Sequence, residues 1–101
     1  MPHFLYRLNP PRASFASDLT EGEAALMQQH SAYWSDLAGR DIAIVFGPVL
    51  DPGGVWGLAV FEAETPEGAE ALARRDPVIS AGCGFSFKLH PMLSAVTKST
   101  A

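Results

Sequence analysis

The alternation between strand-like and helical hydrophobic periodicity limits the fold of this chain more than any other feature. Segments with a period of two residues predict strands, and segments with a period near 3.6 predict helices. The strands are expected over 3–8, 42–46, 55–62 and 85–90, and the two main helices over about 21–37 and 66–76. The chain therefore has the predicted order strand, helix, strand, strand, helix, strand.

Capping residues mark the ends of both predicted helices. Thr20 and Glu23 have the spacing of a capping box, in which each side chain bonds the backbone of the other. Gly39 is expected to end the first helix in the left-handed conformation. Thr65 is expected to cap the second helix, with Pro66 in its first position, where a missing N–H costs nothing.

The loops carry their own predictions. The run 42–46 is β-branched and aromatic throughout, so we expect a strand buried on both faces that ends at Gly47 and Pro48. Residues 9–18 are proline-rich and should form a long loop with one large apolar residue, Phe15. A short extra helical turn is expected over 78–82.

This element order is the split βαβ arrangement of ferredoxin-like folds, βαββαβ. It predicts an α+β domain over residues 1–92, with one antiparallel four-stranded sheet, two helices on one face, and a flexible tail over 93–101. The segment 55–62 is apolar on both faces, so the open sheet face should be a homodimer interface. The alternative is a monomer whose tail or loop covers that face.

Composition excludes several classes of protein. A chain of 101 residues with 48% hydrophobic residues is expected to form a single globular domain. The net charge of −4 argues against nucleic-acid binding, and no apolar run is long enough to span a membrane. Cys83 is the only cysteine, so no internal disulfide is possible, and its glycine neighbours favour a turn over a nucleophile. These features predict a cytoplasmic protein.

His30 and Asp76 are the best candidates for chemistry. His30 stands in the apolar stripe of the first helix, where a buried imidazole needs a hydrogen-bond partner. A backbone carbonyl could satisfy His30, and Asp76 could simply cap a short helix that starts at Pro77. The fold should nevertheless bring the end of the second helix close to the middle of the first. A carboxylate beside an imidazole orients the ring for general acid/base work.

The chain resembles the YCII-related family of small proteins, and the resemblance covers nearly the whole chain from Phe4 to Met92. The motifs that carry it, in order, are Gln29-His30-Ser31-Ala32-Tyr33-Trp34, Phe46-Gly47-Pro48, Gly57-Leu58-Ala59-Val60-Phe61-Glu62, Arg75-Asp76-Pro77, Ala81-Gly82, Phe85 and His90-Pro91. The resemblance implies a ferredoxin-like domain that dimerises as an α/β barrel.

The same resemblance implies an active-site pair, which maps onto His30 and Asp76. It also implies proton-transfer chemistry, because one similar protein is a dehydrochlorinase that acts on a chlorinated hydroquinone. This sequence departs from the better-known members in two loops. The loop after Gly47-Pro48 is short and the stretch 9–18 is rich in proline, so a relative's substrate does not transfer to this chain.

Other residues are weaker candidates. Gly47 and Pro48 are expected to shape a substrate pocket, and Ser80 to add a hydrogen bond near Asp76 unless it is simply an exposed helical serine. Arg12 could hold an anionic substrate, as could Arg75, although each is more commonly a solvated charge. The three histidines have no metal-ligand spacing and no Gly-rich phosphate loop follows a strand, so neither metal nor cofactor is expected.

The leading hypothesis is therefore a small-molecule enzyme that uses His30 as general acid/base and Asp76 to orient it. Elimination or isomerisation is the most natural reaction class, because the sequence has no evident nucleophile or redox group. The competing hypothesis is a dimeric accessory domain that binds a metabolite without catalysis. Hydrogen-bond contact between His30 and Asp76 beside an open pocket would favour the first hypothesis.

Overall fold

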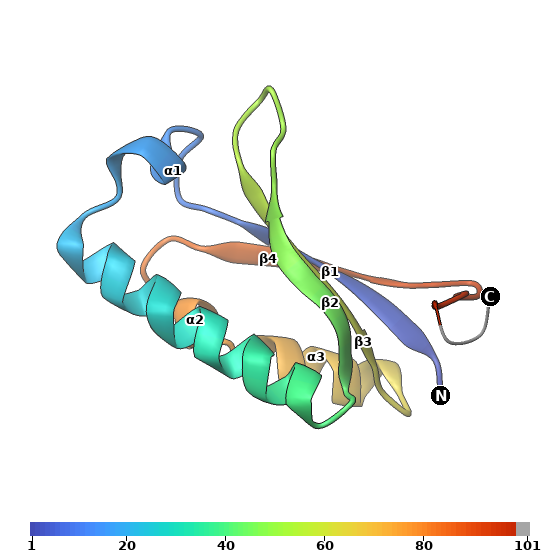
Figure 1. Ribbon diagram of the computed structural model, residues 1–101. Helices are drawn as coiled ribbons and strands as arrows, with labels where there is room; N and C mark the ends of the chain where they lie inside the picture. The colour runs from blue at the N-terminus through green and yellow to red at the C-terminus, as the bar shows by residue number, and fades with distance from the viewer. Residues whose placement is uncertain (99–101) are drawn as a thin grey trace.

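The fold is one antiparallel sheet with helices on one face (Figure 1). A computed structural model describes residues 1–98. Its elements are β1 (His3–Asn9), α1 (Phe15–Asp18), α2 (Glu21–Gly39), β2 (Ala43–Val49), β3 (Trp56–Glu62), α3 (Pro66–Arg74), α4 (Pro77–Ser80) and β4 (Ser86–Pro91). The strand order is β2-β3-β1-β4, with every neighbouring pair antiparallel. The predicted ferredoxin-like α+β fold is confirmed.

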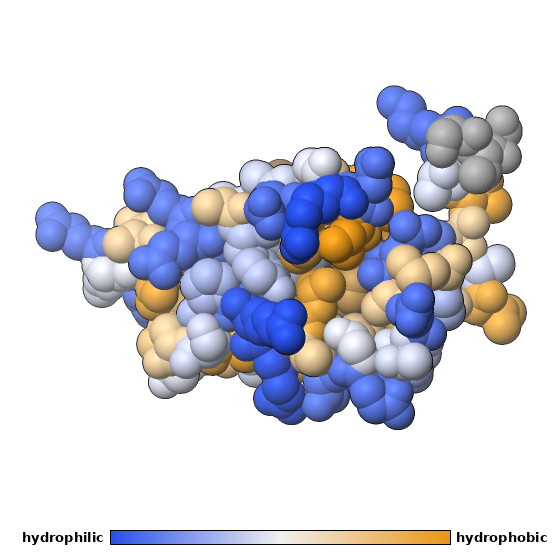
Figure 2. Space-filling model, turned by 90° about the horizontal axis from the view of Figure 1, so that it is seen from below, coloured by the Kyte–Doolittle hydropathy of each residue, from blue (hydrophilic) through white to orange (hydrophobic). Residues whose placement is uncertain are grey.

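The core lies between the sheet and the two long helices. β1 alternates strictly, so Phe4, Tyr6 and Leu8 are buried on the helix side. Trp34 of α2 is fully buried against Tyr6, with the two ring centroids 5.0 Å apart. Seen from below in Figure 2, the surface is mostly hydrophilic, with hydrophobic residues gathered in a strip near its middle.

The start of α2 is as predicted, but its end is not. Thr20 and Glu23 form both hydrogen bonds of the capping box. The prediction that Gly39 ends the helix in the left-handed conformation is wrong, because Gly39 is helical and Arg40 is the C-cap. The left-handed residue is Asp41, with φ 59°. Aspartate tolerates this conformation better than most residues.

β2 differs from its prediction in length and in burial. It does not end at Gly47 and Pro48, which pair with Leu58 and Gly57, and it continues to Val49. A register shift between Ala43 and Val45 inserts an extra residue, a β-bulge. Within this chain the strand is not buried on both faces, because Ile44 is 43% exposed and Val45 is 51% exposed.

The predicted loop over 9–18 is partly helical. β1 continues through Asn9, and α1 forms at Phe15–Asp18, with Phe15 buried. The loop between β2 and β3 lies close to this segment, since a Cβ on Gly54 would come 2.9 Å from the carbonyl oxygen of Ala13. The extra turn predicted over 78–82 is α4, which starts one residue earlier at Pro77.

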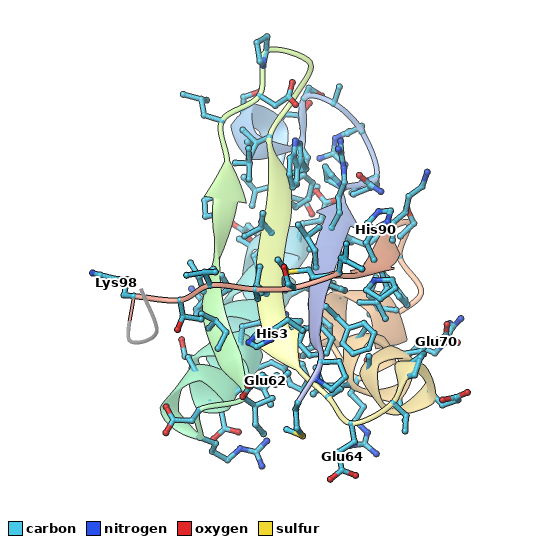
Figure 3. The ribbon with its side chains drawn as sticks, turned by 90° about the vertical axis from the view of Figure 1, so that its right-hand side faces the viewer. His3, Glu62, Glu64, Glu70, His90 and Lys98 are labelled. Carbon is cyan, nitrogen blue, oxygen red and sulfur yellow. The ribbon has the colours of Figure 1, made fainter. Side chains whose placement is uncertain are left out.

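In the part of the chain that the structure describes, the other sheet face carries no helix, and Figure 3 looks onto it. His3 and Glu62 lie side by side there, with Nε2 and Oε1 3.5 Å apart. After β4 the chain runs across this face toward β2, and the Met92 amide donates to the His3 carbonyl. Residues 92–98 are called the C-terminal arm below. The predicted tail also includes 99–101, which lie outside the described residues.

Within residues 1–98, no helix is both long enough and apolar enough to cross a membrane.

Candidate active site

The junction between α3 and α4 fixes the position of Asp76. α3 ends at Arg74, and Asp76 is the N-cap of α4, with Pro77 in the first helical position. Its Oδ1 accepts a hydrogen bond from the Val78 amide at 3.2 Å. The predicted capping role is therefore present. It uses one oxygen of a side chain that is completely buried.

The second oxygen of Asp76 faces α2. His30 lies in the middle of that helix, and its Nδ1 is 2.7 Å from Asp76 Oδ2. The two readings of Asp76, helix cap and histidine partner, are therefore not exclusive, because each uses a different oxygen. His30 bonds this carboxylate, and its side chain keeps 12% exposure.

Two further donors converge on the same oxygen. Tyr6 donates its hydroxyl to Asp76 Oδ2 at 2.9 Å, and Trp34 donates its indole N–H at 2.8 Å. Burial, and secondarily the negative charge of Asp76, raise the pKa of Tyr6 well above its ordinary value. Tyr6 therefore stays protonated and acts as a donor at any pH at which the fold exists.

This donor set assigns the tautomer of His30. An indole N–H and a backbone N–H can only donate, so both oxygens of Asp76 act as acceptors. When the Asp76 carboxylate is ionised, Nδ1 of His30 carries the proton that it shares with Oδ2, because two acceptors 2.7 Å apart would repel. In the neutral ring the lone pair is therefore on Nε2. This nitrogen has no hydrogen-bond partner among the described residues.

The free edge of His30 borders a cavity of about 200 Å³. It lies between α2, the α1 segment and the neighbouring ends of the strands. Its lining is almost entirely apolar, and the polar side chains in it are His30 and Ser31. The aromatic and aliphatic lining comprises Leu8, Pro10, Phe15, Met27, Phe46, Pro48, Val55, Trp56 and Phe85. His30 thus brings one imidazole ring to a mostly apolar cavity.

The other predicted site residues divide into two groups. Gly47 and Pro48 line the cavity. Ser80 is exposed on α4, and its hydroxyl lies 3.4 Å from the Pro77 carbonyl. Arg12 lies outside the lining, where Glu23 and Asp18 bind its guanidinium, and Arg75 is exposed. We therefore include Gly47 and Pro48 in the proposed site and leave out Ser80 and Arg12.

Sequence reasoning missed Tyr6 and Trp34 as parts of the site. Each lies on an apolar face of its element, so the hydrophobic pattern predicts only a packing role for it. Their polar tips offered a signal, since a buried phenol or indole N–H normally has a hydrogen-bond partner. Among the described residues every buried side-chain nitrogen and oxygen has such a partner. Asp76 supplies it for both aromatic residues.

Over residues 1–98, no group of three or more His, Cys, Asp or Glu side chains is arranged to hold a metal ion.

Taken together, the fold and the site define a small ferredoxin-like domain with a buried aspartate that orients one cavity-facing histidine. Comparison with family models places the match in the YCII-related domain, over residues 2–93. This chain belongs to the YCII-related domain family. A search of curated proteins finds no match to the sequence.

A solved structure shares the fold. It is the 5-chloro-2-hydroxyhydroquinone dehydrochlorinase TftG from Burkholderia phenoliruptrix AC1100, in complex with 2,5-dihydroxybenzoquinone. The TM-score is 0.67 at 21% sequence identity, and the match covers 94% of this chain and 96% of that one. At this identity the likeness establishes the fold.

Proposed function

We propose that this protein is a small-molecule enzyme in which His30 transfers a proton to and from a substrate held in the cavity. The observation that carries the proposal is the 2.7 Å contact between His30 Nδ1 and a buried carboxylate, which leaves Nε2 as the base. A positioned histidine contributes roughly 10²- to 10⁴-fold to a proton transfer. Elimination and isomerisation both begin with such a step.

Asp76 acts through the histidine and does not contact the substrate in this proposal. Its carboxylate fixes the ring and stabilises the imidazolium that forms when Nε2 takes a proton. Tyr6 and Trp34 hold the carboxylate in place at 2.9 and 2.8 Å. The Asp76–His30 pair is therefore held in place before substrate binds, which reduces the reorganisation needed in the transition state.

The lining of the cavity limits the class of substrate. Among residues 1–98, no Lys, Arg, Asp or Glu side chain lines it, so a charged ligand would lose its hydration without compensation. Phenylalanine, tryptophan and methionine side chains favour a flat, compact ring. We infer an uncharged cyclic compound with an acidic C–H or O–H. The dihydroxybenzoquinone bound by the structural neighbour is likewise a compact ring that carries hydroxyl groups.

Proton abstraction can be tested without knowing the complete reaction. Enolisable cyclic ketones, phenols and hydroxyquinones are incubated with the protein in D₂O, and loss of the C–H signal is followed by proton NMR. We expect at least one compound to exchange in the presence of the native protein. His30→Gln should slow that exchange by about 10²-fold or more.

A matched control separates catalysis from simple binding. His90→Gln alters an exposed histidine on β4, outside the cavity lining, and should leave exchange unchanged. Thermal shifts measure binding of the same compounds, since a bound ligand raises apparent stability. Compounds that stabilise the protein but exchange no faster than in buffer would favour the accessory, metabolite-binding role.

We also propose that the protein forms a homodimer through its open sheet face. Ile44 and Val45 are exposed on β2, and Leu93 and Val96 point outward from the C-terminal arm. Several exposed apolar residues on and beside one face are typical of an interface.

The free thiol of Cys83 is exposed, which fits a reducing compartment such as the cytoplasm.

A further inference from the structure

One wall of the cavity comes from the irregular segment between β1 and α2. This segment, residues 10–19, contains α1 and contributes Pro10 and Phe15 to the lining. Figure 1 shows α1 bridging from the start of α2 toward the end of the sheet. Phe15 is 7% exposed, and its ring meets Phe85 edge to face at 5.1 Å. Phe15 thus forms part of the cavity wall next to Phe85.

A helix of four residues cannot hold this position by itself. The backbone hydrogen bonds of α1 are local, running from Phe15 to Arg12 and from Ser17 and Asp18 to Ser14. Elsewhere in the segment, Ala13 and Pro11 approach Gly54 and Gly84 so closely that a Cβ on either glycine would meet them. Besides the packing of Phe15 on Phe85, polar side-chain contacts hold the segment in place.

Arg12 provides those contacts. Its Nη1 and Nη2 bind the two carboxylate oxygens of Glu23 at 2.9 and 2.8 Å. Its Nε binds Asp18 Oδ1 at 2.8 Å. Glu23 belongs to α2 and Asp18 to α1, so one guanidinium ties the segment to the long helix. The guanidinium carbon also lies 5.4 Å from the centre of the Phe15 ring.

We propose that residues 10–19 are a hinged cover over His30, that Phe15 sets the size of ligand admitted, and that Arg12 is the latch. Arg12 is a positioning residue in this scheme, and Phe15 is a specificity-determining one. The effect on substrate choice rests on the proposed function, whereas the control of access to His30 does not. A partly exposed ion pair weakens as salt rises, so access should depend on ionic strength.

The test measures access to His30 with diethyl pyrocarbonate, which acylates the free ring nitrogen. Modification of the His30 peptide is followed by mass spectrometry at constant pH, relative to N-acetylhistidine added to each reaction. Arg12→Gln should raise the His30 rate about three- to tenfold, the range expected from losing one well-formed, partly exposed ion-pair cluster. The native rate should climb with sodium chloride, while the rate of the variant stays flat.

Two further variants make the outcome decisive. Arg40→Gln breaks an ion pair with Asp36 at the far end of α2, where both side chains are more than half exposed, and should leave the His30 rate unchanged. Phe15→Ala should raise the rate at every salt concentration. Circular dichroism checks that each variant is folded.

Equal rates for the native protein and Arg12→Gln would overturn the latch, as would an equal effect of Arg40→Gln. No change in Phe15→Ala would overturn the cover itself. None of these outcomes depends on catalysis. A protein that exchanges no substrate proton but shows the expected access pattern would contradict the proposed function and leave the cover intact.

Discussion

Tyr6 and Asp76 are 70 positions apart in the chain, yet the tyrosine hydroxyl donates to the aspartate carboxylate at 2.9 Å in the centre of the core. Tyr6 lies on β1, and Asp76 lies at the junction between α3 and α4. The contact joins the first strand to the last third of the chain, and it places the candidate site inside the packing that holds the domain together. Substitutions at the site should therefore affect stability and activity to different degrees.

Asp76→Asn should destabilise the fold by about 3 kcal/mol, the range for breaking a buried, hydrogen-bonded charge. Either orientation of the amide puts an NH₂ group against a donor, since Val78 donates to Oδ1 and Trp34 to Oδ2. Urea unfolding measures the loss. Asp36→Asn is the control, because its ion pair is exposed, and it should change stability by less than about 0.5 kcal/mol.

Tyr6→Phe should cost about 1 kcal/mol, because it removes one hydrogen bond to Asp76 and keeps the ring that packs on Trp34 and Phe87. The midpoint of urea unfolding reports the change. Proton exchange should fall by less than in His30→Gln, since Nδ1 and Trp34 still hold the carboxylate. A loss of exchange as complete as that of His30→Gln would show that the phenol itself takes part in the chemistry.

Two glycine substitutions should act in opposite directions. Gly39→Ala should stabilise the protein by about 0.5 kcal/mol, because Gly39 is helical and a Cβ there meets nothing within 4 Å. Gly54→Ala should destabilise it by about 1 to 2 kcal/mol, because Gly54 has φ +128° and its Cβ would meet the Ala13 carbonyl oxygen. Thermal unfolding of both variants beside the native protein tests the pair.

Acid should weaken the latch. The hydrogen bonds from Arg12, followed by the one from the Thr20 backbone, lower the pKa of Glu23 to about 2. Because its pKa is lowered, the Glu23 carboxyl is more readily ionised when Arg12 is bound to it than when the two are apart. The stabilisation is therefore complete above the ordinary pKa near 4.5 and is lost as pH falls from there toward about 2.

Carboxyl-carbon NMR titration measures the pKa of Glu23 directly. In Arg12→Gln this pKa should move up toward its ordinary value, stopping short of it because the Thr20 amide still donates. The same titration in Arg40→Gln should match the native protein. A Glu23 pKa that is unaffected by loss of Arg12 would contradict the assignment of the latch.

The proposed dimer predicts twice the monomer mass in size-exclusion chromatography with light scattering at micromolar concentration. Val45→Lys should shift the protein toward the monomer, because it places a charge on the exposed face of β2. Leu50→Lys alters a residue that is 92% exposed in the β2–β3 loop and should leave the mass unchanged. A native monomer would mean that the C-terminal arm alone is enough to cover the sheet.

The fold was largely predictable from the sequence because periodicity and caps depend on neighbouring residues. Alternation along β1 and the Thr20–Glu23 capping box both appear in the structure. The errors came where tertiary context outweighs local preference. Gly39 continues the helix and Asp41 takes the left-handed turn instead. Pro48 stays in β2, since a strand at the sheet edge tolerates a residue without an N–H.

Only some residues of the candidate site could be predicted, because the others depend on contacts between distant parts of the chain. His30 was recognisable because it is a polar residue in the apolar stripe of a helix. Asp76 was recognisable because it lies at the end of the second predicted helix, close to the expected position of His30. Trp34 did not stand out, because its indole fits the core pattern whether or not its N–H has a partner. The ion pair between Arg12 and Glu23 could not be predicted either, because it depends on how the segment 10–19 folds back onto α2.

The two carboxylate oxygens of Asp76 have different partners, and this affects how relatives of this protein should be compared. One oxygen starts a helix and the other binds the histidine, so a relative without the proposed activity would still lose stability if it lost the aspartate. Retention of that residue is weak evidence for an active protein. The histidine is the more informative position, because Tyr6 and Trp34 would still satisfy the carboxylate after its loss.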